Sequence, residues 1–279
     1  MLSMWKLLTA TTLLSSVVFA QSSDDMLIKH LEKNFKNNPS IKELSVHIVD
    51  KTTLQKPAGW SGYIVRVDAN VVQNGQKKDV SQKMIWFANK EGVLSPELFD
   101  MKTGQSLKDL VTPSFKEEFY TKANFLYGNK NAKHKVALFS DPLCPFCRKF
   151  IPEAIEEMKK SPEKFAIYYY HLPLEGLHPA AVPLAKAAIV AEHQGKKDVV
   201  LNLYKVDVDS RESDVSKILE AFNKTMKTDI KPKDLEQEYV LKQYEADRKI
   251  VDELMVRGTP SVFFDGKADK TKRKYQKVK

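Results

Sequence analysis

The sequence predicts two domains, a small α+β domain followed by a larger α/β domain. Two patterns carry this prediction. Residues 24–87 read as one amphipathic helix followed by strands that alternate apolar and polar residues, which is typical of an antiparallel sheet with one solvated face. Residues 136–172 read as an apolar strand, a helix and a second apolar strand, which is typical of a parallel strand pair.

The first twenty residues have the pattern of a secretory signal peptide. Lys6 supplies a positive charge, residues 7–19 are apolar or hydroxyl-bearing, and Val18-Phe19-Ala20 places small residues where a signal peptidase cuts. The stretch is too short for an ordinary membrane-spanning helix, which leaves an uncleaved N-terminal anchor as the alternative. We therefore expect cleavage after residue 20 and export to a compartment in which disulfides persist.

Residues 21–105 are expected to form an N-terminal association domain. A helix over 24–38 is followed by strands over 44–49, 62–72 and 79–87, with Asn74-Gly75 as a hairpin turn. A module of this size buries little apolar surface by itself, and it has strand edges that can pair with another chain. The domain is therefore expected to pair with a second copy, which makes the protein a homodimer.

Residues 106–130 are expected to form a linker helix between the domains. The apolar residues over 106–122 are spaced for one helix face, although Pro113 interrupts the pattern. Turn-forming residues over 124–131 then end the linker. The second domain is expected to run from 131 to 279, with a helical insert over about 178–255.

The chemistry of the chain is expected at Cys144-Pro145-Phe146-Cys147, between the apolar strand over 136–139 and the helix that follows. The unpaired N–H groups of the first helical turn and the helix dipole favour the thiolate form of Cys144. Cys147 lies about one turn further along and is expected to be shielded and protonated. An exposed attacking thiolate and a partner that resolves the mixed disulfide are what thiol–disulfide exchange requires.

Three other uses of two cysteines fit less well. A zinc site needs about four ligands, and only His171 and His178 could complete one here. Haem attachment requires a histidine directly after the motif, where this chain has Arg148. A structural disulfide that closes two intervening residues restrains little of the unfolded chain. We therefore expect no metal, and no cofactor apart from a redox-active Cys144–Cys147 disulfide.

The charge pattern argues against nucleic acid as a partner. Lys and Arg number 45 against 36 acidic residues, which gives a formal net charge of +9. Nucleic-acid-binding domains tend to concentrate basic residues on one face, whereas the lysines here are scattered along the chain. A solvated basic surface is the expected role of these charges.

Three segments in combination resemble the exported thioredoxin-fold disulfide oxidoreductases of the Dsb family. They are the stretch over 139–147 (Phe-Ser-Asp-Pro-Leu-Cys-Pro-Phe-Cys), the helix start His178-Pro179-Ala180-Ala181 and the strand start Gly258-Thr259-Pro260-Ser261. The resemblance covers about 131–267. Together with an N-terminal association domain and a linker, it is most similar to the dimeric disulfide isomerases DsbC and DsbG, which have a threonine before the cis-proline and an aromatic third motif residue.

The resemblance implies a thioredoxin-like fold with an inserted helical subdomain, preceded by a cystatin-like α+β domain, in the periplasm. It implies that Cys144 is the nucleophile and Cys147 the resolving thiol. It also implies that a cis Pro260, with Thr259, Pro145 and Phe146, contacts the substrate. The implied partners are unfolded or misoxidised exported proteins and a membrane redox partner. The alternatives are a DsbA-like net dithiol oxidase and a chaperone-like binding protein with secondary redox activity.

Two features depart from that family pattern. The strand over 136–139 carries no acid, and Asp141, the nearest one, is expected to be an exposed turn or helix cap. After Gly266 the chain has no room for the usual terminal helix. One face of the sheet is therefore expected to be covered differently.

Overall fold

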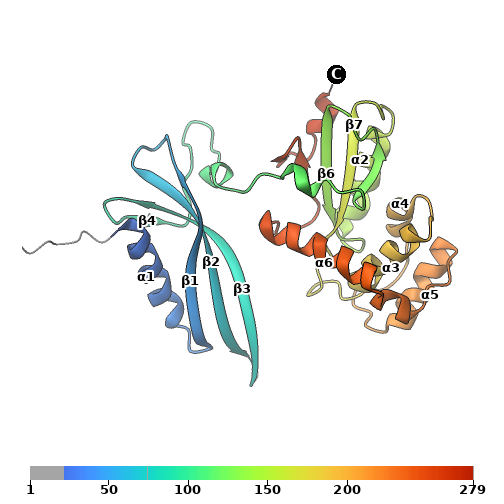
Figure 1. Cartoon of the computed structure of the whole chain (residues 1–279), viewed down its shortest axis with the longest axis horizontal. Coiled ribbons are helices and arrows are strands. Elements are labelled where there is room, and N and C mark those ends of the chain that lie inside the picture. The colour runs from blue at the N-terminus through green and yellow to red at the C-terminus, as the bar shows by residue number, and fades with distance from the viewer. Residues whose placement is uncertain (1–21, 74, 279) are drawn as a thin grey trace, which may run out of the picture. The chain divides into compact units, whose positions relative to one another are not determined.

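A computed structural model describes residues 22–73 and 75–278, so the expected signal peptide over 1–20 lies outside the described residues. The chain forms two compact units that divide between Val111 and Thr112 (Figure 1). Among the described residues, no helix combines the length and the apolar character needed to cross a membrane.

The N-terminal unit is one helix, α1 (Ser23–Lys36), on a four-stranded antiparallel sheet. Its strands lie in the order β1 (Ile41–Thr53), β2 (Trp60–Gln73), β3 (Gln76–Asn89) and β4 (Leu94–Ser95). Strands β2 and β3 pair without a break from Trp60–Asn89 to Gln73–Gln76, as the hairpin pattern predicts, while Asn74 itself lies outside the described residues. The α+β character of this unit is confirmed.

The core of this unit follows the two periodicities of its sequence. Helix α1 buries Leu27 and Leu31, and the alternate β2 residues Tyr63, Val65 and Val67 are at most 6% exposed. All five belong to one hydrophobic cluster. Because side chains repeat every second residue in a strand and about every fourth in a helix, one face of each element meets the other.

Both edges of this sheet carry unpaired backbone. Among the described residues, β1 pairs with β2 alone, and β4 covers β3 only at Phe87 and Ala88. The remainder of β3 is exposed over 76–82 and carries Lys77, Lys78 and Asp79. Charged side chains of this kind protect a strand edge from uncontrolled pairing.

The linker helix expected over 106–130 is wrong. This region contains two short 3₁₀ helices, η1 (Leu107–Leu110) and η2 (Glu117–Phe119), and the strand β5 (Phe125–Gly128). Pro113 cannot continue a helix, because it lacks an N–H and its ring clashes with the preceding turn. Phe115 and Phe119 pack instead into the core of the second unit, where they are 4% and 6% exposed.

The second unit is built on a five-stranded sheet in the order β5-β7-β6-β8-β9. Its strands are β5, β6 (His134–Ser140), β7 (Phe165–His171), β8 (Ser261–Phe264) and β9 (Lys267–Ala268). β6 and β7 are parallel and are joined by helix α2 (Pro145–Met158), whereas β5, β8 and β9 run antiparallel to their neighbours. The parallel pair predicted from the two apolar runs is confirmed.

Each face of this sheet is covered by a separate apolar layer. On one face α2 buries Ile151, Ile155 and Met158 against Val136 and Leu138 of β6. On the other face lie Phe115, Phe119 and the end of helix α6 (Glu238–Glu253).

The segment after β9 packs against the sheet on the same side as α2. Tyr275, in the short 3₁₀ helix η4 (Lys274–Lys277), is 5% exposed and packs into the same layer as α2. The buried carboxylate of Asp269 holds this segment by accepting the backbone N–H groups of Thr271 and Lys274. This segment is therefore packed through Tyr275 and Val278, while Lys274 and Lys277 are exposed.

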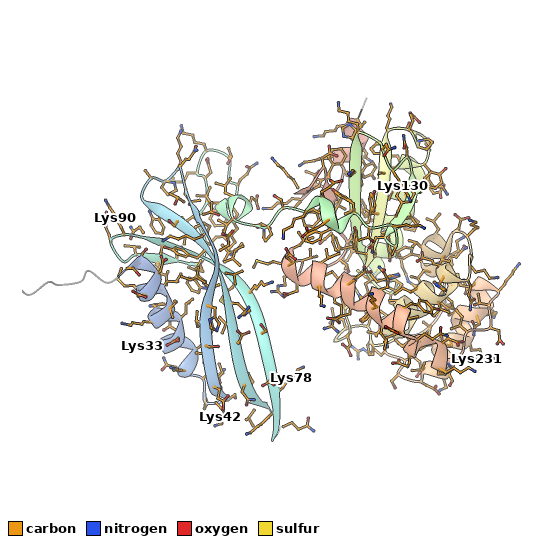
Figure 2. The ribbon with its side chains drawn as sticks, viewed as in Figure 1. Lys33, Lys42, Lys78, Lys90, Lys130 and Lys231 are labelled. Atoms are coloured by element: carbon orange, nitrogen blue, oxygen red, sulfur yellow. The ribbon has the colours of Figure 1, made fainter. Side chains whose placement is uncertain are left out.

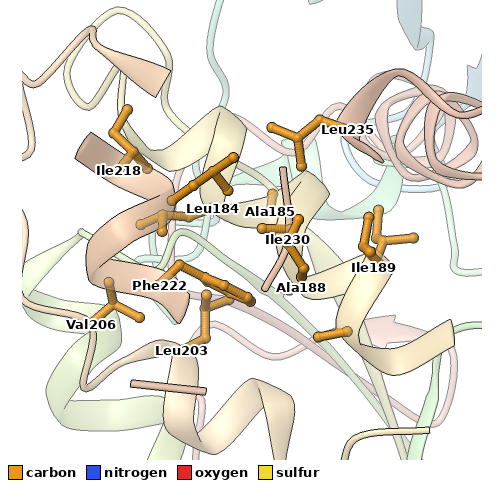
Figure 3. Close-up of a cluster of buried hydrophobic side chains, with 14 of the residues drawn as sticks. Leu184, Ala185, Ala188, Ile189, Leu203, Val206, Ile218, Phe222, Ile230 and Leu235 are labelled. Carbon is orange, nitrogen blue, oxygen red and sulfur yellow. The ribbon is translucent and has the colours of Figure 1, made fainter. Parts of the chain in front are cut away.

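The helical insert has its own core. It consists of α3 (Ala181–His193), α4 (Val199–Leu203), α5 (Val215–Met226), the 3₁₀ helix η3 (Pro232–Glu236) and α6. Figure 3 shows Leu184, Leu203 and Phe222, from three of these helices, meeting in one buried cluster. Leu143, next to the cysteines, belongs to this cluster and connects it to the active-site loop. Of the lysines labelled in Figure 2, Lys33, Lys42 and Lys78 lie in α1, β1 and β3, and the other three lie in turns or loops.

Candidate functional site

The cysteine motif lies where β6 ends and α2 begins. Cys144 is the N-cap residue of α2, and Pro145 occupies its first turn, where a missing N–H costs nothing. Both cysteines are free thiols. The position expected from the sequence, with the first sulfur at a helix N-terminus, is the one the structure has.

The two sulfurs differ less in exposure than the sequence suggests. Cys144 is 5% exposed and Cys147 is 0% exposed. The Cys144 sulfur lies 3.8 Å from the carbonyl oxygen of Thr259, so the loop before β8 covers it. Within the motif over 144–147, only Pro145 and Phe146 are exposed to solvent, and Phe146 is 76% exposed.

Thr259 and Pro260 lie against the cysteines, as the resemblance implies. Their peptide bond is cis, and Pro260 is buried. The Thr259 hydroxyl faces Cys147 and lowers its pKa, but it makes no hydrogen bond of normal geometry. Beside this loop is a hollow of about 490 Å³, lined mainly by residues 254–263.

Cys147 is strongly held as a thiol. Burial raises the pKa of Cys147 to about 11, against the opposing effects of the Ser140 and Thr259 hydroxyls. The adjacent charge of Cys144 raises this pKa further. Burial destabilises the Cys147 thiolate by more than these hydrogen bonds stabilise it. The Cys147 thiol is therefore protonated at neutral pH.

Asp141 is not the exposed cap that the sequence analysis expects, because it is 0% exposed. One carboxylate oxygen accepts the backbone N–H groups of Leu143 and Cys144 at 2.7 and 3.1 Å. The other lies 2.7 Å from the N–H of Leu174 and 3.0 Å from Nδ1 of His178. A turn cap is the correct local description, but the second oxygen joins the cysteine loop to the segment that precedes α3.

Arg148 holds the same loop from the other side. Its guanidinium donates to the carbonyl oxygens of Pro142 (3.0 Å) and Val206 (2.8 Å). A guanidinium presents several N–H donors in one rigid plane, so it can fix two backbone segments at once. The sequence marked Arg148 only as the residue that excludes haem attachment, and no local signal identifies this role.

The site therefore consists of a covered sulfur at a helix N-terminus, a buried protonated thiol and an apolar exposed dipeptide between them. The sequence-predicted residues Cys144, Cys147, Thr259 and Pro260 are brought together, while Pro145 and Phe146 form the open side. Within the described part of the chain, no cluster of three or more His, Cys, Asp or Glu side chains could hold a metal ion.

The family described as thioredoxin matches residues 120–279 of this chain. No curated protein matches the sequence. Among solved structures, the chain is similar to a thioredoxin-like oxidoreductase from Silicibacter pomeroyi DSS-3, with 22% identity over 54% of this chain and 84% of that chain and a TM-score of 0.43.

Two further solved structures are similar at the same level. Proteus mirabilis ScsC in a compact conformation has 20% identity over 54% of this chain and 73% of that chain, with a TM-score of 0.45. Oxidised BdbD from Bacillus subtilis has 18% identity over 59% of this chain and 91% of that chain, with a TM-score of 0.46.

Proposed function

We propose that this chain, which belongs to the thioredoxin family, is an extracytoplasmic protein disulfide isomerase of the DsbC and DsbG type. It is a thiol–disulfide oxidoreductase whose redox pair is Cys144 and Cys147. The proposal concerns the direction of the reaction, the substrates and the compartment. It depends mainly on the contrast between Cys144 at the N-terminus of α2 and the buried, protonated Cys147.

Cys144 is the nucleophile in this proposal. Its thiolate attacks one sulfur of a substrate disulfide, forming a bond between Cys144 and that sulfur while the second substrate sulfur leaves with the electron pair. In isomerisation, another substrate thiolate then attacks the mixed disulfide and releases Cys144 as a thiolate.

Cys147 can also resolve the mixed disulfide. It attacks the Cys144 sulfur, closes the Cys144–Cys147 disulfide and releases the substrate reduced. Because burial keeps Cys147 protonated at neutral pH, this step competes weakly with attack by a substrate thiol. A slow resolving thiol gives a misoxidised substrate time to rearrange, which supports the isomerase direction.

The loop at Thr259 and Pro260 is proposed to hold the substrate backbone. An extended segment could pair with the backbone of Thr259, as peptides do when they add a strand to a sheet. The neighbouring hollow of about 490 Å³ offers room for its side chains. The exposed Phe146 and Pro145 supply an apolar contact that suits unfolded chains, whose apolar residues are not yet buried.

The remaining parts of the proposal concern assembly and location. The strand edges of β1 and β3 support pairing of the N-terminal units (residues 21–105) into a homodimer. The signal-peptide pattern over 1–20 supports cleavage and export to the periplasm. An isomerase also requires a membrane redox partner that returns Cys144 and Cys147 to the dithiol form, since only the dithiol attacks a disulfide.

The proposal is tested with a client protein whose disulfides have been scrambled. The reduced protein is expected to restore the client's native activity, and Cys144→Ser is expected to abolish this. If the oxidised protein instead rapidly introduces disulfides into a reduced client and the reduced protein rescues none, the chain is a net oxidase. If Cys144→Ser still suppresses aggregation as well as wild type and neither redox reaction occurs, the chain is a binding protein.

A further inference from the structure

The hollow beside the loop at Thr259 and Pro260 carries more positive than negative charge. Its lining includes three basic residues and one acidic residue, which are Arg257, Lys270, Lys272 and Asp269. The buried part of the lining is apolar and comes from Leu254, Val256, Val262 and Phe263. All of these residues belong to the second unit. The hollow therefore combines an apolar floor with a net positive charge.

The pairing of β8 with β9 brings Lys272 to this hollow. β9 runs antiparallel to β8, and the N–H of Asp269 bonds to the carbonyl oxygen of Val262 at 2.7 Å. Because the two strands run in opposite directions, the chain after Asp269 continues toward the start of β8, just before which Pro260 lies. The N–H of Lys272 bonds to the carbonyl oxygen of Asp269 at 3.0 Å and closes a turn. Lys272 and Pro260 therefore line the same hollow.

The ammonium group of Lys272 is available to an incoming anion. The side chain is half-buried and makes no hydrogen bond or ion pair with any residue that the structure describes. The Asp269 carboxylate does not pair with it, because it accepts the N–H groups of Thr271 and Lys274 and the Thr271 hydroxyl. Partial burial of a charge is costly unless a counter-charge compensates for it. A carboxylate that enters the hollow supplies this counter-charge.

The other two basic residues of the lining act at longer range. Arg257 and Lys270 are exposed, and each has a further interaction within the protein. Exposed charges at the rim of a binding surface raise the rate at which an oppositely charged segment arrives more than they raise its affinity. The selection of one position in a client segment therefore depends on Lys272.

We propose that Lys272 selects client segments that carry an acidic residue close to the reacting cysteine. This point rests on the proposed function, in which an extended client segment pairs with the backbone of Thr259. Successive side chains of an extended segment point to opposite faces, so alternate residues near the cysteine face the hollow. A glutamate or aspartate there pairs with Lys272. A lysine at the same place brings two like charges together and is disfavoured.

Peptides with a single cysteine test this selection. Each cysteine is capped as a mixed disulfide with thiopyridine, a neutral group that absorbs light when it is released. The Cys144 thiolate attacks the peptide sulfur, a bond forms between these two sulfurs, and the thiopyridine leaves with the electron pair. The variant Cys147→Ala is the background throughout, because it stops at the mixed disulfide between Cys144 and the peptide.

The peptides differ at one position, which carries glutamate, glutamine or lysine and is moved along both sides of the cysteine. Stopped-flow absorbance gives the second-order rate constant, and the rate with 2-mercaptoethanol corrects for the effect of each peptide's charge on its own disulfide. At one or two positions the glutamate peptide is expected to react about fivefold faster than the glutamine peptide, and the lysine peptide more slowly than both. The difference is expected to shrink at about 1 M salt, because salt screens a partly exposed ion pair.

Three variants of Lys272 separate its charge from its shape. Lys272→Gln is expected to give equal corrected rates for the glutamate and glutamine peptides. Lys272→Arg is expected to retain the preference, because it keeps the positive charge. Lys272→Glu is expected to reverse it, so that the lysine peptide reacts fastest. Dipyridyl disulfide, which carries no peptide, should react with all of these proteins at one rate, because Cys144 itself is unchanged.

The matched control is Lys267→Gln. Lys267 is an exposed lysine of β9 that pairs with Phe264 and is not part of the lining of the hollow. This variant should keep the preference for glutamate.

Two kinds of failure are distinguishable. If the Cys147→Ala protein reacts equally with the three peptides at every position, selection by Lys272 is wrong. The same holds if Lys272→Gln keeps the preference, or if Lys267→Gln lowers it as much. If the protein reacts with no peptide faster than 2-mercaptoethanol does, the nucleophilic role of Cys144 in the proposed function fails instead.

Discussion

The carbonyl oxygen of Thr259 lies 3.8 Å from the sulfur of Cys144, and these residues are far apart in the sequence. The contact places the loop before β8 over the active-site sulfur. An incoming disulfide must therefore approach from the start of α2, where Pro145 and Phe146 are exposed. The remaining thiol, Cys147, is closed to solvent.

The first prediction concerns alkylation of the two thiols. In reduced Cys147→Ser, iodoacetamide is expected to modify Cys144 readily at neutral pH. In reduced Cys144→Ser, Cys147 is expected to react at least about a hundredfold more slowly, since a thiol with a pKa of about 11 is almost entirely protonated at pH 7. Mass spectrometry over time measures both rates. Similar rates in the native proteins would contradict the assigned protonation of Cys147, and in denaturant both should react alike.

The second prediction is that Asp141→Ala destabilises the protein strongly. It leaves the N–H groups of Leu143, Cys144 and Leu174 without their acceptor inside the protein, and His178 without its partner. The free energy of unfolding should fall by about 3 kcal/mol or more. Urea denaturation measures this change.

A matched control for Asp141 is Asp209→Ala. Asp209 also caps a turn, by accepting the N–H of Arg211, but it is exposed. Water can replace this acceptor, so the loss should be about 1 kcal/mol or less. If the two variants lose the same free energy of unfolding, the burial of Asp141 does not contribute to its effect on stability.

The third prediction concerns pH and two buried groups of the second unit, Asp247 and His171. Burial raises the pKa of Asp247 from 3.8 to about 7, so the folded state binds more protons and stability falls as pH rises through this window. Burial lowers the pKa of His171 from 6.5 to about 4, so the unfolded state binds more protons and stability rises between these values. The two contributions oppose each other over most of the range.

Removing one of these two groups should therefore reveal how the other makes stability depend on pH. In Asp247→Asn, the free energy of unfolding is expected to rise with pH between about 4 and 6.5 more steeply than in wild type, by up to about 1.4 kcal/mol per pH unit. In His171→Phe, it is expected to fall relative to wild type over the same range. Urea unfolding at several pH values measures the slopes, and parallel curves for all three proteins would contradict the assignment.

The fourth prediction is that the packed chain end contributes to the stability of the second unit. Tyr275→Ala should lower the free energy of unfolding by about 3 kcal/mol, because it empties a buried site against α2. Lys277→Ala, in the same short 3₁₀ helix but exposed, should change it by less than about 0.5 kcal/mol. Thermal unfolding compares the two, and a loss for Lys277→Ala as large as for Tyr275→Ala would show that the tail acts through its backbone or charge.

The fifth prediction is that the mature protein is a homodimer assembled through residues of about 24–110. The N-terminal unit has a small core and unpaired strand edges, and a second copy can satisfy both. Light scattering at micromolar concentration should give twice the mass of one chain. A monomer at this concentration would contradict the dimer and favour net oxidation over isomerisation.

Local pattern was sufficient for the cysteine pair and for the elements on either side of it. The strand β6, the N-terminal position of Cys144 in α2 and the buried residues Ile151, Ile155 and Met158 follow from repeats of two and about four residues. The parallel pairing of β6 with β7 follows from the helix between them. These properties depend on neighbours within a few residues, so the chain specifies them before it packs.

Packing alone decided the surroundings of the sulfurs. The same acid that caps a local turn, Asp141, is buried because the segment before α3 closes over it and supplies His178. Tyr204 reaches Ser140 only because α4 packs against the sheet. Burial and hydrogen bonding between elements depend on how distant segments meet, and no periodicity within one segment records this. The amino-acid sequence by itself therefore determined which residues carry the redox chemistry, and the tertiary structure decided which groups surround them and what can reach them.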